Sequence, residues 1–381
     1  MDPFTHTLIG LVAGEAVIQA RARRASAGAT GRRALLWSVS AVANVFPDVD
    51  FTCVGATAPA QLGYVLHHRG YTHTLVAAPV QGALVVALAW LWLRLRARAK
   101  PVSRADWGWA FGLAVLGPML HVGLDGLNTY GVHPYWPFDA AWRFGDTLFI
   151  VEPALLLALG AALYLATKLR PAKARLALAI GAAASAAVVA TFALASACAR
   201  TRLAALHARL APDARLLDVV LTPYPLNPLC WSVVFVGVER ERYFARRATY
   251  SAWARALPAA ACPEPLRVVG GPGSIFRLTT AGLPSQPELR WHDGFEGTAA
   301  ELRRLRAEHC SVDALLRFVR VPAWTTLSDG TVRVGDLRFD GAGKDGRGVL
   351  GTLELPPDKR EACPSHVPSW RWPRLDLLDG A

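Results

Sequence analysis

The first half of the chain alternates long apolar runs with short polar connections. The third to the sixth run are long enough to cross roughly 30 Å of hydrocarbon as helices. The first two are shorter and Glu15 interrupts the first, so they would span only inside a bundle or be re-entrant. The runs cover Thr7–Ala20, Ala34–Phe46, Thr72–Leu93, Trp107–Leu127, Thr147–Thr167 and Ala174–Ala199. This pattern predicts an α-helical membrane bundle of about six transmembrane or re-entrant helices.

The pattern changes after about Arg200, where Pro and Gly become frequent and charges are dispersed. Alternation and β-branched content predict strands at Leu216–Leu221, Trp231–Val238, Arg240–Tyr250, Val332–Phe339 and Gly348–Leu355. Helical periodicity predicts two short helices, at Ala299–His309 and Val312–Val319. We therefore expect a helical membrane domain over residues 1–199 and a small soluble α+β domain over residues 200–381.

Composition and charge agree with a membrane protein. Hydrophobic residues make up 53% of the chain and charged residues only 18%, against about 25% in soluble domains. The net charge is +12 and the pI about 9.9, but the basic residues gather between apolar runs instead of alternating with aromatic residues, which argues against a nucleic-acid partner. The clusters are Arg21, Arg23, Arg24, Arg32, Arg33; Arg94, Arg96, Arg98, Lys100, Arg104; and Lys168, Arg170, Lys173, Arg175.

These clusters predict the orientation of the chain in the membrane. They follow the first, third and fifth apolar runs, and short loops rich in Lys and Arg stay in the cytoplasm. The N-terminus, the loops Pro47–Tyr71 and Asn128–Asp146, and everything after Ala199 would then face outward. We expect a multi-pass protein of the bacterial inner membrane, with the lipid bilayer as its first partner and its soluble domain outside the cytoplasm.

The cysteines leave two alternatives open. Cys230, Cys262, Cys310 and Cys363 fall in the C-terminal part without CxxC spacing, so a zinc ribbon is not expected. Outside the cytoplasm they would form two disulfides of undetermined pairing. Free buried thiols are the alternative.

A set of polar residues, most of them His and carboxylates, lies on the predicted outer side, at the ends of separate apolar runs. Imidazole and carboxylate are the usual ligands of Zn²⁺, Mn²⁺ and Fe²⁺, and ionisable groups at membrane depth imply a partner or an ion. His121 and Asp125 are four residues apart, so they share a helical face. The residues are His6, Asn44, Asp48, Asp50, His67, His68, Arg69, His73, His121, Asp125, Asp146 and Glu152.

Each residue alone has a simpler interpretation. A single His at a helix end is more often a cap, Asp48 and Asp50 fit an ordinary turn, and the pair of His121 and Asp125 is a common helix contact. The convergence on one side is what favours a shared metal site. Such a site would support hydrolysis, because a bound metal makes water nucleophilic and clamps the oxygens of a phosphoryl or acyl centre.

Four motifs in order resemble a known family. They are Met1-Asp2-x-x-Thr5-His6-x-Leu8-x-Gly10, Asn44-x-x-Pro47-Asp48-x-Asp50, His68-Arg69-Gly70-x-Thr72-His73 and His121-x-x-x-Asp125. They look like the bacterial membrane-bound, predicted metal-dependent hydrolases of the YdjM/YfhP type, over about residues 1–153. The resemblance implies metal-dependent hydrolysis. Its pattern is similar to zinc-dependent phospholipase C and P1-type nucleases, which would favour a phosphoester substrate. Glu152 stands where related chains often carry Asp.

The resulting hypothesis is an integral membrane hydrolase that acts on a phosphoester or ester, including a lipid-linked one. The expected ligands of one or more divalent ions, zinc first and manganese or iron as alternatives, are His6, Asp48, His68, His73, His121 and Asp125. The expected catalytic residues are Asp50, Arg69, Asp146 and Glu152, with Arg69 pairing with a substrate anion. The alternative is a structural metal site in a non-catalytic protein whose soluble domain binds a partner. A metal or proton transporter would need ionisable residues through the membrane depth, where Glu15 is the main example.

Overall fold

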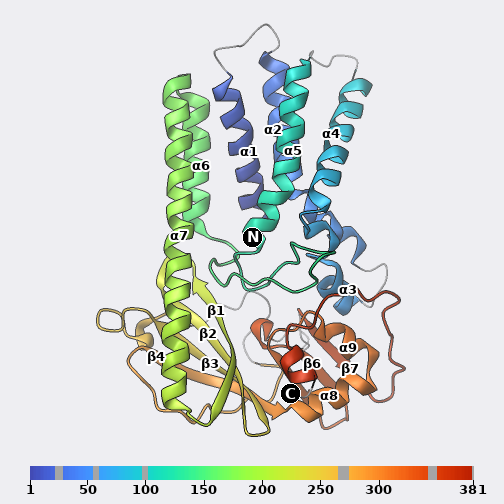
Figure 1. Ribbon diagram of the computed structural model, residues 1–381, viewed down its shortest axis with the longest axis vertical. Helices are drawn as coiled ribbons and strands as arrows, with labels where there is room; N and C mark the ends of the chain where they lie inside the picture. The colour runs from blue at the N-terminus through green and yellow to red at the C-terminus, as the bar shows by residue number, and fades with distance from the viewer. Residues whose placement is uncertain (22–28, 55–59, 97–101, 265–273, 342–349, 380–381) are drawn as a thin grey trace. The chain divides into compact units, whose positions relative to one another are not determined.

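The fold is described from a computed structural model of the chain (Figure 1). The structure describes residues 1–21, 29–54, 60–96, 102–264, 274–341 and 350–379. These residues form two compact units. The first contains Met1–Asp50, Arg69–Asp139 and Arg143–Ala193, and the second contains Phe51–His68, Ala140–Trp142 and Leu194–Ala381. The boundary that the sequence predicts at residue 199 stays a prediction.

Helices dominate the first unit, as the apolar runs predict. They are α1 (Pro3–Ala20), α2 (Ala29–Val45), α4 (Ala77–Leu95), α5 (Arg104–Asp125), α6 (Pro153–Lys168) and the first part of α7 (Pro171–Leu210). The 3-10 helices Phe46–Cys53 and Tyr71–His73 carry polar motif residues. Asp2 begins α1 by accepting the N–H of Thr5 at 3.0 Å, and Pro3 follows at the first helical position.

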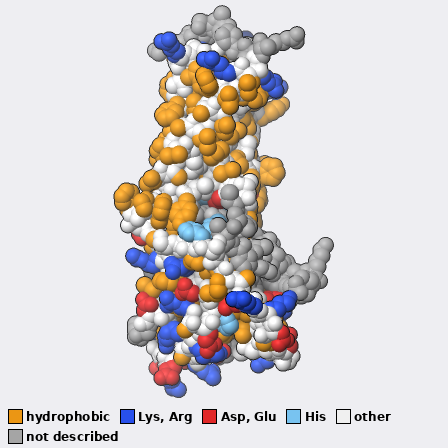
Figure 2. All heavy atoms as spheres, turned by 90° about the vertical axis from the view of Figure 1, so that its right-hand side faces the viewer, with side chains coloured by type: hydrophobic (Ala, Val, Ile, Leu, Met, Phe, Trp, Pro, Cys, Tyr) orange, Lys and Arg blue, Asp and Glu red, His pale blue; other side chains and the backbone are white. Residues whose placement is uncertain are grey.

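Three helices, α4, α5 and α7, are long and apolar enough to cross a membrane, and α6 is a shorter apolar helix. The exposed side of α4 carries Val80, Leu84 and Leu88 in a stripe of helical spacing. At the end of that stripe Arg94 lies over the ring of Trp90 and Arg96 over that of Trp92, at 4.5 and 4.2 Å. Figure 2 shows this apolar surface on the helices and the blue Lys and Arg side chains at its end. An apolar surface bordered by Trp and Arg is typical of a helix that meets the bilayer interface.

Glycines let the helices that carry the motif histidines approach α2. A Cβ on Gly10, one turn after His6, would lie 2.5 Å from the carbonyl oxygen of Ser40. A Cβ on Gly117, one turn before His121, would lie 2.8 Å from the Cβ of Ala43. Small residues of this kind permit close helix packing in membranes. They bring α1 and α5 together on α2, next to the motif residues.

Glu15, the charge inside the first apolar run, is wholly buried and satisfied. Its carboxylate accepts hydrogen bonds from Gln19, Arg33 and Trp37 at 2.6, 2.8 and 2.9 Å. A buried carboxylate needs such partners to remain charged. Its surroundings are those of a structural residue that ties α1 to α2.

The second unit contains two antiparallel sheets. The first has the order β1–β2–β3–β4, with β1 at Ala214–Tyr224, β2 at Asn227–Glu239, β3 at Arg242–Ser251 and β4 at Leu289–Thr298. The second has the order β5–β6–β7, with β5 at Pro322–Thr326, β6 at Val332–Asp336 and β7 at Thr352–Leu355. The helices of this unit are α3 (Ala60–His67), α8 (Ala299–Glu308), α9 (Cys310–Leu316), α10 (Leu375–Leu378) and the last part of α7.

A helical N-terminal region followed by a sheet-rich domain is therefore confirmed, with some local corrections. The strand predicted to run to Phe339 ends at Asp336, whose side chain accepts the N–H of Arg338 at 3.0 Å and begins a 3-10 turn. Two strands were not predicted. β4 has little alternation because Asp293, Gly294 and Gly297 interrupt it, and β5 begins with Pro322. The start of the predicted strand Gly348–Leu355 lies outside the described residues.

The four cysteines of the C-terminal part are paired. Cys230 joins Cys262 and Cys310 joins Cys363, with Cα–Cα distances of 5.8 and 5.7 Å. These distances are usual for disulfides. The structure thus selects the disulfide alternative and defines its pairing. A second group that could hold a metal consists of Cys310, Glu361 and Cys363, but its two cysteines are close together because they form the Cys310–Cys363 disulfide.

Candidate metal centre

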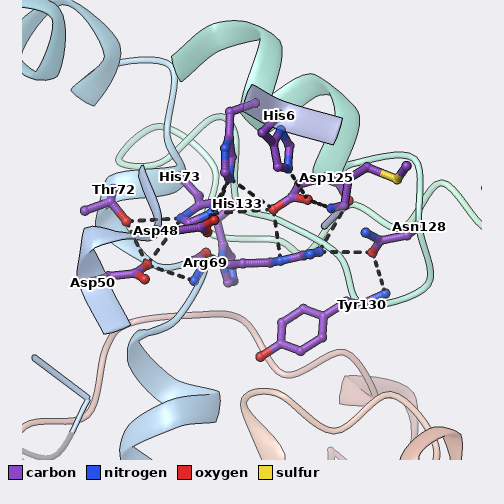
Figure 3. Close-up of polar contacts among 12 residues, drawn as sticks. His6, Asp48, Asp50, Arg69, Thr72, His73, Asp125, Asn128, Tyr130 and His133 are labelled. Atoms are coloured by element: carbon purple, nitrogen blue, oxygen red, sulfur yellow. Dashed lines mark hydrogen bonds and ion pairs between the residues drawn. The ribbon is translucent and has the colours of Figure 1, made fainter. Parts of the chain in front are cut away.

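Four side chains of the first unit converge where its helices end. Asp48 comes from the 3-10 helix after α2, His73 from the 3-10 helix before α4, and His121 and Asp125 from the last turn of α5. One ligand atom from each lies within 4.8 Å of the other three. His73, His121 and Asp125 are buried, and the side chain of Asp48 is 16% exposed. Figure 3 shows His73, Asp48 and Asp125 pointing toward one another.

Five of the six distances between the ligand atoms are close to those around one tetrahedral ion. Nε2 of His73 and Nε2 of His121 are 3.1 Å apart, and each lies 3.4 Å from Oδ1 of Asp48. Their distances to Oδ2 of Asp125 are 3.5 and 3.4 Å. Ligand atoms about 2.0–2.2 Å from a tetrahedral zinc ion are themselves about 3.3–3.5 Å apart. The donor set and its spacing therefore fit Zn²⁺.

The other ring nitrogen of each histidine has a partner that orients it. Nδ1 of His121 lies 2.6 Å from the carbonyl oxygen of Asn44, a contact in which the imidazole must donate. Nδ1 of His73 lies 3.3 Å from Oδ2 of Asp50 and 3.1 Å from the hydroxyl of Thr72. A partner on Nδ1 fixes the orientation of each ring with Nε2 facing the site, as is usual for a histidine that binds metal.

Asp50 thus lies behind His73. Its Oδ2 also accepts the backbone N–H of Arg69 at 3.1 Å and the hydroxyl of Thr72 at 2.8 Å (Figure 3). Asp50 holds the turn that presents His73.

Arg69 is buried among partners of its own. Its Nε lies 3.0 Å from Oδ2 of Asp125, its Nη1 donates to Oδ1 of Asn128 at 3.0 Å, and its guanidinium lies 4.5 Å from the ring centre of Tyr130. Arg69 is 3% exposed and has φ of 60°, a left-handed backbone that is uncommon outside glycine. The guanidinium fixes Asp125 and leaves little surface for a ligand.

His6 adds another imidazole beside the group of four. Its ring stacks on that of His121 with centroids 3.7 Å apart, and its Nε2 lies 3.4 Å from Oδ1 of Asp125. The side chain is wholly buried, and neither ring nitrogen makes a hydrogen bond within the described part of the chain. The amino group of Met1 contacts the same oxygen of Asp125.

The charge state of Asp48 suits a ligand. Burial raises the pKa of Asp48, but hydrogen bonds from His121 and His73 outweigh burial and hold that pKa well below the usual range of a carboxyl group. Asp48 is therefore a carboxylate at neutral pH, which is the form that binds metal.

Comparison with known proteins places the chain in a family. A family model described as YdjM inner membrane protein matches residues 1–205. The chain belongs to the YdjM family of inner membrane proteins. No curated protein and no solved structure matches it. The resemblance seen in the motifs is thereby confirmed, and so is a location in the inner membrane.

The YdjM match includes every site residue that the sequence nominated, and the structure brings four of them into one group. His6 contacts that group, and Asp50 and Arg69 support it. His68 belongs to the second unit, where its ring lies 4.1 Å from that of Phe51 and 4.8 Å from that of Tyr64. Within the described chain, His68 is outside the group of four.

Asp146 and Glu152 are wholly buried and are likewise outside the group. Glu152 is the N-cap of α6, where its Oε1 accepts the N–H of Ala154 at 3.2 Å. Asp146 has φ of 49°. Their expected role as base or additional ligand stays a prediction.

Motif reasoning missed His133. It is wholly buried, and its Nδ1 lies 3.4 Å from the carbonyl oxygen of Arg69. Burial lowers the pKa of His133 to about 3, so its ring is neutral at physiological pH. His133 lies in the loop between α5 and α6 without regular spacing to another ligand, so only its place in the YdjM-matched region pointed to it.

Proposed function

We propose that the chain is an integral membrane, metal-dependent hydrolase that acts on a phosphoester or ester at the outer face of the inner membrane. The observation that carries the proposal is the convergence of two imidazole nitrogens and two carboxylate oxygens, with each nitrogen 3.4–3.5 Å from both oxygens and 3.1 Å from the other nitrogen. Buried polar groups of this kind need partners, and a divalent ion would be a partner of all four.

In this proposal Asp48, His73, His121 and Asp125 hold the ion, with zinc first and manganese or iron as alternatives. When bound, the ion would supply Lewis acidity that polarises a phosphoryl or acyl oxygen and makes water nucleophilic near neutral pH. Asp48 is the most exposed of the four, so the substrate approaches from its side.

The remaining residues position groups and move protons. Hydrolysis forms a bond from a water oxygen to phosphorus, breaks the bond to the leaving alcohol, and transfers a proton to that alcohol. Asp146 and Glu152 remain the proposed bases. Arg69 was expected to pair with a substrate anion, and we propose instead that it holds Asp125, because Asp125, Asn128 and Tyr130 surround its guanidinium.

Two observations support an outer site. The basic clusters follow alternate apolar runs, which favours cytoplasmic positions for them. The two disulfides of the second unit suit an oxidising compartment such as the periplasm.

A structural metal site is the second candidate, and one observation favours it. The protein would supply all four ligands of a tetrahedral ion, and closed sites of that kind are usually structural. The buried His6 argues for catalysis, because a closed structural site does not require a further imidazole in contact with its ligands.

Activity of metal-loaded, detergent-purified protein separates the two candidates. We expect hydrolysis of at least one member of a panel of phosphomonoesters, phosphodiesters and carboxylic esters, and loss of that activity in His121→Ala. The matched control is His207→Ala, which removes a buried histidine of the second unit that stacks between Phe235 and Phe244. Protein that binds metal stoichiometrically and leaves the whole panel intact would favour the structural site.

A further inference from the structure

An apolar groove of about 530 Å³ lies among α1, α6 and α7 of the first unit. Figure 1 shows α6 and α7 beside α1. Small and branched aliphatic side chains line the groove, and its polar lining residues are Arg175 and Ser185. On α7 the alanines Ala179, Ala182 and Ala186 form a recess, because each presents only a methyl group.

Helix spacing places one end of the groove near the candidate metal centre. Two residues that line the groove, Ile9 and Leu124, lie one helical turn after His6 and His121, which belong to or contact that centre. Residues three apart share a face of a helix. Leu124 also directly precedes Asp125. The same helix faces therefore carry the polar site and the beginning of the apolar groove.

The other end of the groove carries a charge. Arg175 lines the groove there, and its guanidinium donates to the carbonyl oxygen of Gln19 at 3.3 Å, near the end of α1. From Arg175 to Val189 the lining of α7 extends about 21 Å, at 1.5 Å for each residue. One leaflet of the hydrocarbon core is about 15 Å thick, so the groove can hold the full length of a lipid chain.

We propose that this groove holds a hydrocarbon chain of a membrane lipid whose phosphoester head reaches the metal centre. The position of the head rests on the proposed function, whereas the binding of the chain does not. A lipid chain enters from the bilayer without a change of solvent, because lipid tails are as apolar as the leucines of the wall. The preference of the groove for a lipid chain then comes from its shape.

The volume of the groove suits one chain of a lipid. About 530 Å³ lies within the range of small-molecule sites. The polar site beyond one end of the groove matches an amphipathic molecule.

Photo-crosslinking in nanodiscs tests this proposal. The full chain is reconstituted in phosphatidylethanolamine and phosphatidylglycerol with a phosphatidylglycerol that carries a diazirine in one acyl chain, and labelled residues are mapped by mass spectrometry. We expect labels on the groove side of α7, around Ala179 and Ala182, and at least a fivefold loss in Ala182→Trp. The control Ala183→Trp changes the next residue, which is exposed and does not line the groove, and should keep the labelling.

Equal labelling on all sides of α7 would mean that the lipid is only bulk solvent, and it would overturn the proposal. So would equal loss in the two Trp variants. Absence of label from the groove in wild-type protein would indicate another occupant. Groove labelling without any phosphoester turnover would leave the inference standing and remove the proposed function. Turnover of a water-soluble phosphodiester together with evenly spread labels would support the proposed function and overturn the inference about the lipid chain.

Discussion

Asp50 offers a test of how the proposed site is held together, because it contacts His73 without belonging to the group of four. Its Oδ2 lies 3.3 Å from Nδ1 of His73 and also accepts from Arg69 and Thr72. In Asp50→Asn the amide oxygen can still accept from Arg69 and Thr72, so the turn should persist. The negative charge that makes His73 a stronger ligand is lost.

Loss of such a second partner typically weakens metal affinity 10- to 100-fold, which corresponds to about 1.4–2.7 kcal/mol. We expect this change in Kd when metal-stripped Asp50→Asn is titrated with Zn²⁺ against a chromogenic chelator in detergent. The control is Asp106→Asn, which removes another buried carboxylate of the first unit, paired with Arg21 and Arg32. An unchanged Kd in Asp50→Asn, or an equal loss in both variants, would refute the assigned role.

Three further predictions concern stability and covalent structure. Arg69→Ala should lower the free energy of unfolding by about 3–5 kcal/mol, because it removes the guanidinium that pairs with the buried Asp125. Thermal unfolding in detergent measures this, and a loss no larger than that of Tyr130→Phe would contradict it. Peptide mapping under non-reducing conditions should find Cys230 joined to Cys262 and Cys310 to Cys363, and reduction should cost about 2–5 kcal/mol for each bond; any other pairing counts against the fold of the second unit. Because burial lowers the pKa of His133 to about 3, its contribution to the free energy of unfolding is complete above pH 6.5 and is lost as the pH falls toward 3. Below pH 6.5, His133→Gln should therefore reduce the slope of the free energy of unfolding against pH by up to about 1.4 kcal/mol per pH unit. An unchanged slope would show that His133 ionises in the folded protein.

Four of the six predicted ligands lie together in the structure, and the sequence could predict their convergence because they lie in short motifs at helix ends. His121 and Asp125 are four apart on α5, and Asp48 and His73 lie in connections that return to the same end of the helices. Polar residues among apolar runs are conspicuous, and the membrane limits where their helices can end. These constraints made the convergence visible without coordinates.

The roles of individual residues were harder to predict. The catalytic roles expected of Asp50 and Arg69 stay predictions. The side-chain partners of Arg69, Asn128 and Tyr130, come from a loop whose course no periodicity describes. His133 was missed for the same reason. The pairing of the cysteines depends on contacts between strands far apart in the chain, and β4 lacks the alternation by which a strand is recognised.

Metal content tests the central claim most directly. Detergent-purified wild-type protein, His121→Ala and His207→Ala are analysed side by side by elemental mass spectrometry after zinc supplementation and dialysis. We expect about one zinc per chain in the wild type and in His207→Ala, and loss of that zinc in His121→Ala. Wild-type protein without metal, or full retention in His121→Ala, would contradict it.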